Sequence, residues 1–146
     1  MEALKRQFTT ALFVAGGLAG GATTRMFIET GSKRLKINPR YSADAANCQF
    51  TFNENATIGA GGTTPPSTRH NLEDGDTADF TLTQDAAVTA AGTAVMQDIS
   101  LGLQTRVQWV QKPFMLAPNT TYQFIIQNFT GGVLNPSIEI LITQDA

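Results

Sequence analysis

The sequence predicts an all-β protein, an antiparallel β-sandwich of jelly-roll-like form or a barrel, preceded by an extended N-terminal arm. After residue 24, apolar and polar residues alternate with a period of two in many short runs. Gly, Pro and Asn separate these runs, and none of them has the apolar spacing of an amphipathic helix. Short strands divided by turns are typical of sandwiches and barrels.

Length and composition agree with a single β-rich domain. The chain has 146 residues, enough to bury roughly 70% of the surface that its unfolded form exposes. Its one cysteine, Cys48, lies beside aromatic strand residues, where a small core hydrophobe is expected rather than a nucleophile. Only 15% of the residues are charged, so Thr, Gln, Asn and Gly fill most of the polar positions.

The charge is unevenly distributed along the chain. Residues 1–41 hold seven basic and two acidic side chains, a net of +5, and the remainder carries −7. A basic cluster of Lys33, Arg34, Lys36 and Arg40 therefore either meets an acidic partner or forms an ordinary solvated face. The negative total charge argues against nucleic acid as that partner.

The first 24 residues predict an arm. Lys5 and Arg6 precede the apolar run ALFVAGGLAGGA, which resembles a secretory signal, but its four glycines each cost a helix about 1 kcal/mol. The run is also too short to span a bilayer. We expect a short helical turn over residues 2–13 and a Gly/Ala segment that becomes ordered on a neighbouring subunit, followed by a sandwich domain over residues 25–146.

Phe8, Leu12 and Phe13 are the apolar side chains of this arm. Apolar groups on a poorly self-supporting segment are costly to leave in water. Docking on another subunit and packing into the core of the same domain both explain them, and the sequence leaves the two alternatives open.

From Arg25 onward the strands can be placed in order. Residues 25–30 and 34–38 alternate on either side of Gly31-Ser32, which predicts a hairpin. Residues 48–53 alternate with Cys48, Phe50 and Phe52 facing inward. Further strands are expected at 79–83, 95–103 and 106–111, while 84–92 is either a helical turn or a loop.

The strongest alternation lies between residues 117 and 145. Two runs, YQFIIQN and SIEILIT, place one set of apolar residues on one face each, and a Gly-Gly…Asn-Pro segment joins them. This pattern predicts an antiparallel pair. The inward side chains are Tyr122, Phe124, Ile126, Ile138, Ile140 and Ile142.

Residues 54–76 form a long connection rich in Gly, Thr and Pro, and connections of this length are often functional. Arg69, His70 and Asn71 lie in it and are candidate contact residues. His70 is the only histidine and has no cysteine near it, so a solvent-facing role is favoured over a metal ligand or a base. The acidic run at 73–76 lacks EF-hand spacing. We therefore expect no catalytic residues, no metal and no cofactor.

Several segments resemble a known family when taken in order. They read FTFNENATIGAGGT, TRHN, DISLG, QWVQKPFMLAPNTTYQFIIQN and IEILITQD. Together they resemble small β-sandwich proteins of tailed-bacteriophage virions, of the capsid-decoration or cement type. The resemblance spans about residues 25–145, and each of its motifs taken singly consists of residues that are common in turns and strands.

The resemblance implies a non-enzymatic virion protein that binds the outside of a capsid at joints between major capsid subunits and stabilises it. It would assemble in the host cytoplasm, act on the capsid surface and form a homo-oligomer, with a trimer favoured. Its partners would be the major capsid protein and further copies of itself, without nucleic acid or membrane. The expected contact residues are Lys5, Arg6, Phe8, Leu12, Phe13, Arg69, His70 and Asn71.

A head-fibre or tail protein that contacts the host is the main alternative. Such a protein would bind surface glycans through its loops, and exposed Tyr41 or Trp109 beside carboxylates would favour it. An enzyme that depends on His70 is the third and least favoured hypothesis.

Overall fold

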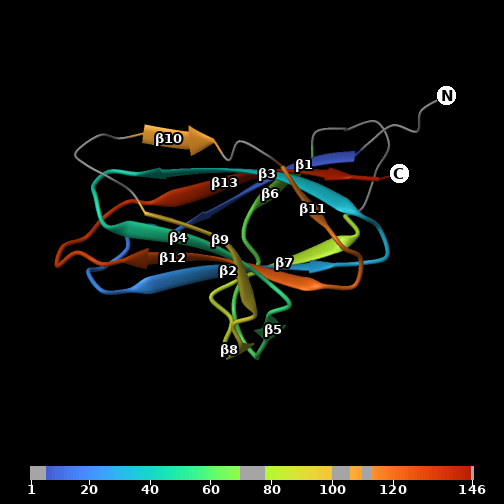
Figure 1. Cartoon of the computed structure of the whole chain (residues 1–146), viewed down its shortest axis with the longest axis horizontal. Coiled ribbons are helices and arrows are strands. Elements are labelled where there is room, and N and C mark those ends of the chain that lie inside the picture. Colours follow the sequence, from blue (N-terminus) through green and yellow to red (C-terminus); the bar gives the residue numbers. More distant parts are fainter. Residues whose placement is uncertain (1–5, 70–77, 100–105, 110–112, 146) are drawn as a thin grey trace.

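A computed structural model describes residues 6–69, 78–99, 106–109 and 113–145 of the chain. These residues contain β-strands and no helix, so none of them forms a helix capable of crossing a membrane. Two large antiparallel sheets pack face to face (Figure 1). This arrangement confirms the predicted all-β sandwich.

The larger sheet has six strands and the other has five. The six-stranded sheet has the order β10 (Arg106–Trp109), β3 (Leu35–Ala43), β13 (Ser137–Gln144), β1 (Arg6–Phe13) and β6 (Ser67–Arg69), and β11 (Phe114–Leu116) also pairs with β3. The five-stranded sheet has the order β7 (Phe80–Gln84), β2 (Thr23–Thr30), β12 (Thr121–Asn128), β4 (Cys48–Glu54) and β9 (Thr93–Ile99). A two-stranded ribbon joins β5 (Thr57–Ile58) to β8 (Val88–Ala90).

The core lies between the two sheets and is filled by alternate residues of each strand. Phe52 of β4 stacks on Phe124 of β12, with ring centroids 4.6 Å apart. Burying a side chain of this size stabilises the fold by roughly 1.5–3 kcal/mol. The inward faces predicted for β4, β12 and β13 are confirmed, because all of these residues are buried: Cys48, Phe50, Phe52, Tyr122, Phe124, Ile126, Ile138, Ile140 and Ile142.

The predicted pairing of the two C-terminal strands is wrong. β12 pairs with β2 and β4, whereas β13 pairs with β1 and β3 in the opposite sheet. Hairpin loops usually have 2–5 residues, and the segment 129–136 is long enough to cross from one sheet to the other. The two apolar faces therefore meet across the core instead of lying side by side.

The predicted hairpin of residues 25–30 and 34–38 is wrong for a related reason. β2 lies in the five-stranded sheet and β3 in the six-stranded sheet. Asp79, just before β7, holds the corner between them: its carbonyl accepts from Gly31 N at 2.9 Å, and its carboxylate accepts from Lys33 N at 2.9 Å. A sheet-crossing corner and a hairpin turn begin with the same alternation, so the sequence pattern did not separate them.

The N-terminal segment also differs from its prediction. Residues 6–13 form β1, an inner strand paired with β13 on one side and β6 on the other, instead of a helical turn. Phe8, Thr10 and Leu12 face the core with 4%, 2% and 0% exposure, which is the period of a strand. This part of the expected arm thus belongs to the sandwich, and core packing in the same domain is the correct alternative for Phe8 and Leu12.

The β5–β8 ribbon covers part of the outer face of the five-stranded sheet. Beneath it Phe27 is fully buried against Ala56 and Ala86, with Ile58 and Val88 packed at the side. The segment 84–92, for which the sequence allows a helical turn or a loop, supplies β8, and the long connection after residue 54 supplies β5 and β6. A second small core therefore lies outside the main one.

Candidate contact surfaces

The sequence-based contact residues do not form one exposed surface within the described part of the chain. Phe8 and Leu12 are 4% and 0% exposed, so a partner could touch them only if the sheet opened. Phe13, at the end of β1, is 46% exposed, and Arg6 is half-buried. Lys5, His70 and Asn71 lie outside the described residues, as does the acidic run at 73–76.

The structure does bring the N-terminal segment next to the long connection. β6 pairs with β1 so that Phe8 lies opposite Arg69 and Thr10 lies opposite Ser67. The Thr10 hydroxyl donates to the carbonyl of Pro66 at 2.9 Å. These contacts link the two regions as neighbouring strands, and their role in capsid contact stays a prediction.

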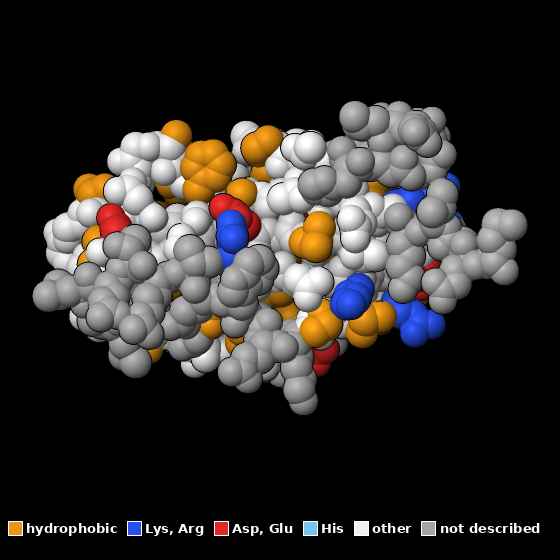
Figure 2. All heavy atoms as spheres, turned by 90° about the horizontal axis from the view of Figure 1, so that it is seen from above, with side chains coloured by type: hydrophobic (Ala, Val, Ile, Leu, Met, Phe, Trp, Pro, Cys, Tyr) orange, Lys and Arg blue, Asp and Glu red, His pale blue; other side chains and the backbone are white. Residues whose placement is uncertain are grey.

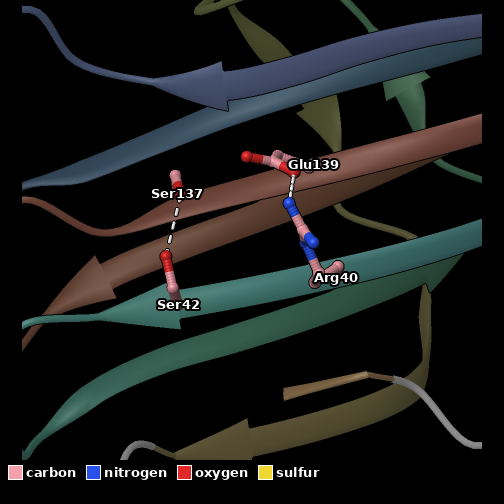
Figure 3. Close-up of polar contacts among 4 residues, drawn as sticks. All are labelled: Arg40, Ser42, Ser137 and Glu139. Carbon is pink, nitrogen blue, oxygen red and sulfur yellow. Dashed lines mark hydrogen bonds and ion pairs between the residues drawn. The ribbon is translucent and has the colours of Figure 1, made fainter. Parts of the chain in front are cut away.

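The basic cluster is spread over two places. Lys33 and Arg34 lie in the corner between β2 and β3, while Lys36 and Arg40 lie on β3. Arg40 forms an ion pair with Glu139 of β13 (Figure 3). An exposed pair of this kind contributes little stability, and it neutralises a charge that an acidic partner would otherwise meet.

The outer face of the six-stranded sheet is mostly uncharged. Ser42 and Ser137 share a hydrogen bond of 3.0 Å beside the Arg40–Glu139 pair (Figure 3). Seen from this side, Lys, Arg, Asp and Glu side chains are few and scattered (Figure 2). The described residues of this face therefore provide no concentrated charge that would attract a charged ligand.

The described residues show little that could carry a reaction. Burial raises the pKa of the Cys48 thiol to about 11, with the Asp44 carboxylate adding to the shift. Cys48 is therefore a neutral thiol at physiological pH and a poor nucleophile. No group of three or more His, Cys, Asp or Glu side chains that could hold a metal ion occurs among the residues described.

An open hollow of about 320 Å³ lies between the end of β2 and the start of β7. The carboxylate of Asp79 already accepts from Lys33 N and from the Ser32 hydroxyl, which gives it a structural role at the corner. The residues that line the hollow are Glu29, Thr30, Gly31, Ala78, Asp79, Phe80 and Thr81.

The glycan-binding alternative gains no support from Tyr41. This side chain is 7% exposed and stacks on Phe50 in the core, with ring centroids 4.6 Å apart. Trp109 lies on β10, but its side chain is outside the described residues. Of the three glycosylation triplets in the sequence, Asn55 and Asn119 are exposed, whereas Asn128 is 0% exposed and cannot accept a sugar in the folded state.

Three loops meet at one end of the sandwich, and we call them together the loop tip: residues 14–22, 44–47 and 129–136. They gather at the end opposite the labelled N and C termini (Figure 1). Leu18 and Leu134 exchange two backbone hydrogen bonds, of 2.7 and 3.0 Å. Phe129 N donates to the carbonyl of Asn47 at 3.0 Å, which ties the third loop to the other two.

Asn128, at the end of β12, is the centre of the loop tip. Its Nδ2 donates to the carbonyls of Leu18, Ala19 and Gly132 at 2.9, 3.2 and 2.8 Å. Its Oδ1 accepts from the backbone N and the hydroxyl of Thr130 at 2.9 and 2.7 Å. Every polar atom of this buried amide is thus satisfied, and it fixes two loops at once.

The outside of the loop tip is apolar and nearly uncharged. Phe129 and Val133 are 54% and 61% exposed. Val133 lies over Gly17, where an added Cβ would overlap its Cγ1. Asp44 is the only charged residue of the three loops, and its carboxylate accepts from the backbone N of Asn135 at 2.9 Å. The tip is therefore rigid and apolar, and its three loops contain no Lys or Arg.

Sequence reasoning did not find the loop tip. The three glycine pairs at 16–17, 20–21 and 131–132 mark its loops in the sequence, but taken alone they predict only an arm segment and a hairpin loop. A buried Asn at a strand end beside two such loops is the signal that could have indicated it. Because its bonds join residues 110 positions apart, the pattern along the chain does not reveal them.

No model of a known protein family matches this chain, and no curated protein is significantly similar to it. The resemblance described from the sequence therefore remains a hypothesis about function. The fold and the surfaces described above provide the basis for testing it.

Proposed function

We propose that this chain is a non-enzymatic structural protein of a tailed-bacteriophage virion. In this proposal it binds the outside of the capsid at joints between major capsid subunits and stabilises the shell. Its partners are the major capsid protein and further copies of itself, in a trimer, and it acts on the capsid surface after assembly in the host cytoplasm. No nucleic acid, membrane, metal or cofactor takes part.

The observation that carries the proposal is the ordered series of segments that resembles decoration proteins. The first segment falls on β4 and β5, another runs through β11 into β12, and the last lies on β13. They contribute the central strands β12 and β13, whose apolar faces fill the core. A β-sandwich is the fold that the resemblance implies, so the two are consistent.

The surfaces give a second line of support. A decoration protein needs binding faces and no reaction centre, and the described residues present a sheet face with few charges and a rigid apolar tip. A ligand that binds the expanded capsid lattice better than the dissociated subunits stabilises that lattice by mass action. Repeated weak contacts on a lattice add up to effectively tight binding.

The experiment is to mix the purified full chain with mature heads that lack it, prepared from the phage or prophage whose genome carries its gene. We expect co-sedimentation with the heads at a fixed stoichiometry, density over the joints by cryo-electron microscopy and a higher temperature of DNA release. Failure to bind these heads, with binding to a glycan array instead, would overturn the proposal in favour of a host-contact protein.

A further inference from the structure

The structure assigns a contact surface that the sequence did not indicate: we propose that the loop tip, through Phe129 and Val133, docks into an apolar hollow on the surface of the major capsid protein. This inference rests on the proposed function and deepens it by naming the surface that touches the capsid. Both side chains are more than half exposed, among the largest values for any large apolar residue described.

The rigidity of the tip makes these two side chains suitable anchors. Asn128 joins the 14–22 and 129–136 loops through five hydrogen bonds, and the 44–47 loop is held by Asn47 and Asp44. A surface that is already ordered loses little conformational entropy on binding. A few anchor residues near the centre of an interface carry most of its binding energy, and an aromatic side chain such as Phe129 buries a large area when it fills that role.

The types of side chain in the tip favour a protein as the partner over a nucleic acid, a membrane or a sugar. Nucleic acids and anionic membranes are bound through Lys and Arg, and the three loops contain neither. Sugar recognition needs free hydrogen-bonding groups, but the side chains of Asn128, Thr130 and Asn135 are already bonded within the tip. The surface of the tip that is available to a partner therefore consists mainly of apolar side chains.

The small apolar area of the tip favours a partner that is present in many copies, such as a capsid lattice, over a single partner molecule. A stable protein interface buries about 800 Å² on each side, and two exposed side chains supply only part of such an area. One contact of this size is weak, but the same contact repeated by an oligomer over many capsid subunits is effective. A dimer of this chain held together by the tip alone is therefore not the expected occupant.

The test compares two double variants in the capsid-binding assay. Phe129→Ser with Val133→Ser removes both anchors of the tip. Val95→Ser with Ile99→Ser removes two apolar side chains that are also exposed, 47% and 38%, from β9 at the edge of the five-stranded sheet. All four side chains are exposed, so both proteins should keep the circular dichroism and thermal midpoint of the wild type. If the tip variant unfolds early, Val133→Lys alone replaces it.

We expect the tip variant to lose at least tenfold in affinity for the heads, while the control variant binds as the wild type does. Equal binding by the tip variant would overturn this inference and leave the proposed function intact. A wild type that does not bind heads would overturn the proposed function, and the inference with it. If the tip variant changes the oligomeric state of the free protein, as seen by sedimentation velocity, the tip's partner is a second copy and the inference is wrong.

Discussion

The loop tip and the β5–β8 ribbon are both glycine-rich additions to the sandwich with buried amide side chains beneath them, yet they satisfy these amides differently. In the tip, Asn128 uses every polar atom of its side chain. Under the ribbon, Asn53 Nδ2 and Gln123 Nε2 both donate to the carbonyl of Ala91, at 2.9 and 2.7 Å. Asn53 Oδ1 and Gln123 Oε1 are buried without a hydrogen-bond partner.

Amides that are equally buried therefore do not contribute equally to stability. A buried acceptor without a donor carries a desolvation cost of about 1–3 kcal/mol, which offsets the gain from the bond made by the same amide. The tip amide is therefore expected to be strongly stabilising and the ribbon amides nearly neutral. A fold region with unsatisfied polar groups opens more readily than one without them.

The largest expected effect is that of Asn128→Ala. The substitution removes five hydrogen bonds and the volume of a fully buried side chain, so we expect the free energy of unfolding to fall by about 3 kcal/mol. Urea denaturation followed by fluorescence measures this loss. Asn135→Ala, an exposed amide in the same tip, is the control and should cost less than about 1 kcal/mol. Equal losses for the two variants would contradict the central role of Asn128.

A second prediction concerns Gly92, which holds the carbonyl of Ala91 in place under the ribbon. Its φ is +80°, and a Cβ there would overlap the carbonyl of Glu54. We expect Gly92→Ala to cost about 2 kcal/mol. Gly61→Ala is a matched control, because Gly61 has a φ of +85° but open space around the added Cβ.

The Gly61 substitution should therefore cost only the strain of an alanine at positive φ, about 1 kcal/mol. Thermal unfolding of the two variants separates the steric contribution from the backbone contribution. If both lose the same stability, the close approach of Gly92 to Glu54 has no energetic weight, and the ribbon is more adaptable than the tip.

The sequence predicted well which side chains of the strands face the core. Alternation in β4, β12 and β13 identified which side chains fill the core, because each inward residue must be apolar whichever strand lies beside it. Strand pairing was not predictable in the same way. The corner at Gly31 and the segment 129–136 look like hairpin connections. Contacts with residues far away in the chain, Asp79 for the corner and Leu18 for the segment, accompany the crossing of both between sheets.

Long-range contacts also explain why the loop tip could not be predicted from the sequence. The glycine pairs at 16–17 and 20–21 predict a segment that becomes ordered only on a neighbouring subunit, since a chain segment taken alone has no partner to order it. In the fold, Gly20 packs against Gly131 and Leu18 pairs with Leu134. Order in these loops comes from contacts between distant segments, which a single sequence does not display.

A smaller effect is expected at Gln123, beneath the ribbon. Gln123→Met keeps the shape of the side chain, removes the bond to Ala91 and also removes the unpaired oxygen. These two changes oppose each other, so we expect the free energy of unfolding to change by no more than about 1 kcal/mol in either direction. Denaturation in urea beside Asn128→Leu tests the contrast, because the latter should lose far more. A large loss for Gln123→Met would show that the ribbon depends on its amide as the tip does.

The last prediction uses Cys48 as a reporter of tip opening. Cys48 starts β4, lies opposite Asn128 and is fully buried, so a thiol reagent reaches it only when this end of the sandwich opens. We expect labelling of the native protein to be slow. It should become faster in Asn128→Ala, and the Gly92→Ala and Gln123→Met variants should change it only as far as they change global stability. Timed reaction with a chromogenic disulfide at pH 8 measures the rate.

The pH dependence of this labelling follows from the raised pKa of Cys48. In the folded state the thiol titrates at about 11, whereas its ordinary value is 9.0. The opened state therefore supplies the thiolate, and the rate should rise up to about pH 9. Because the folded-state pKa is the higher one, the stability contributed by the buried thiol is fully present below pH 9 and is lost as pH rises toward 11. A Cys48→Ala variant should lack this alkaline loss, and an unchanged loss in that variant would assign it to another group.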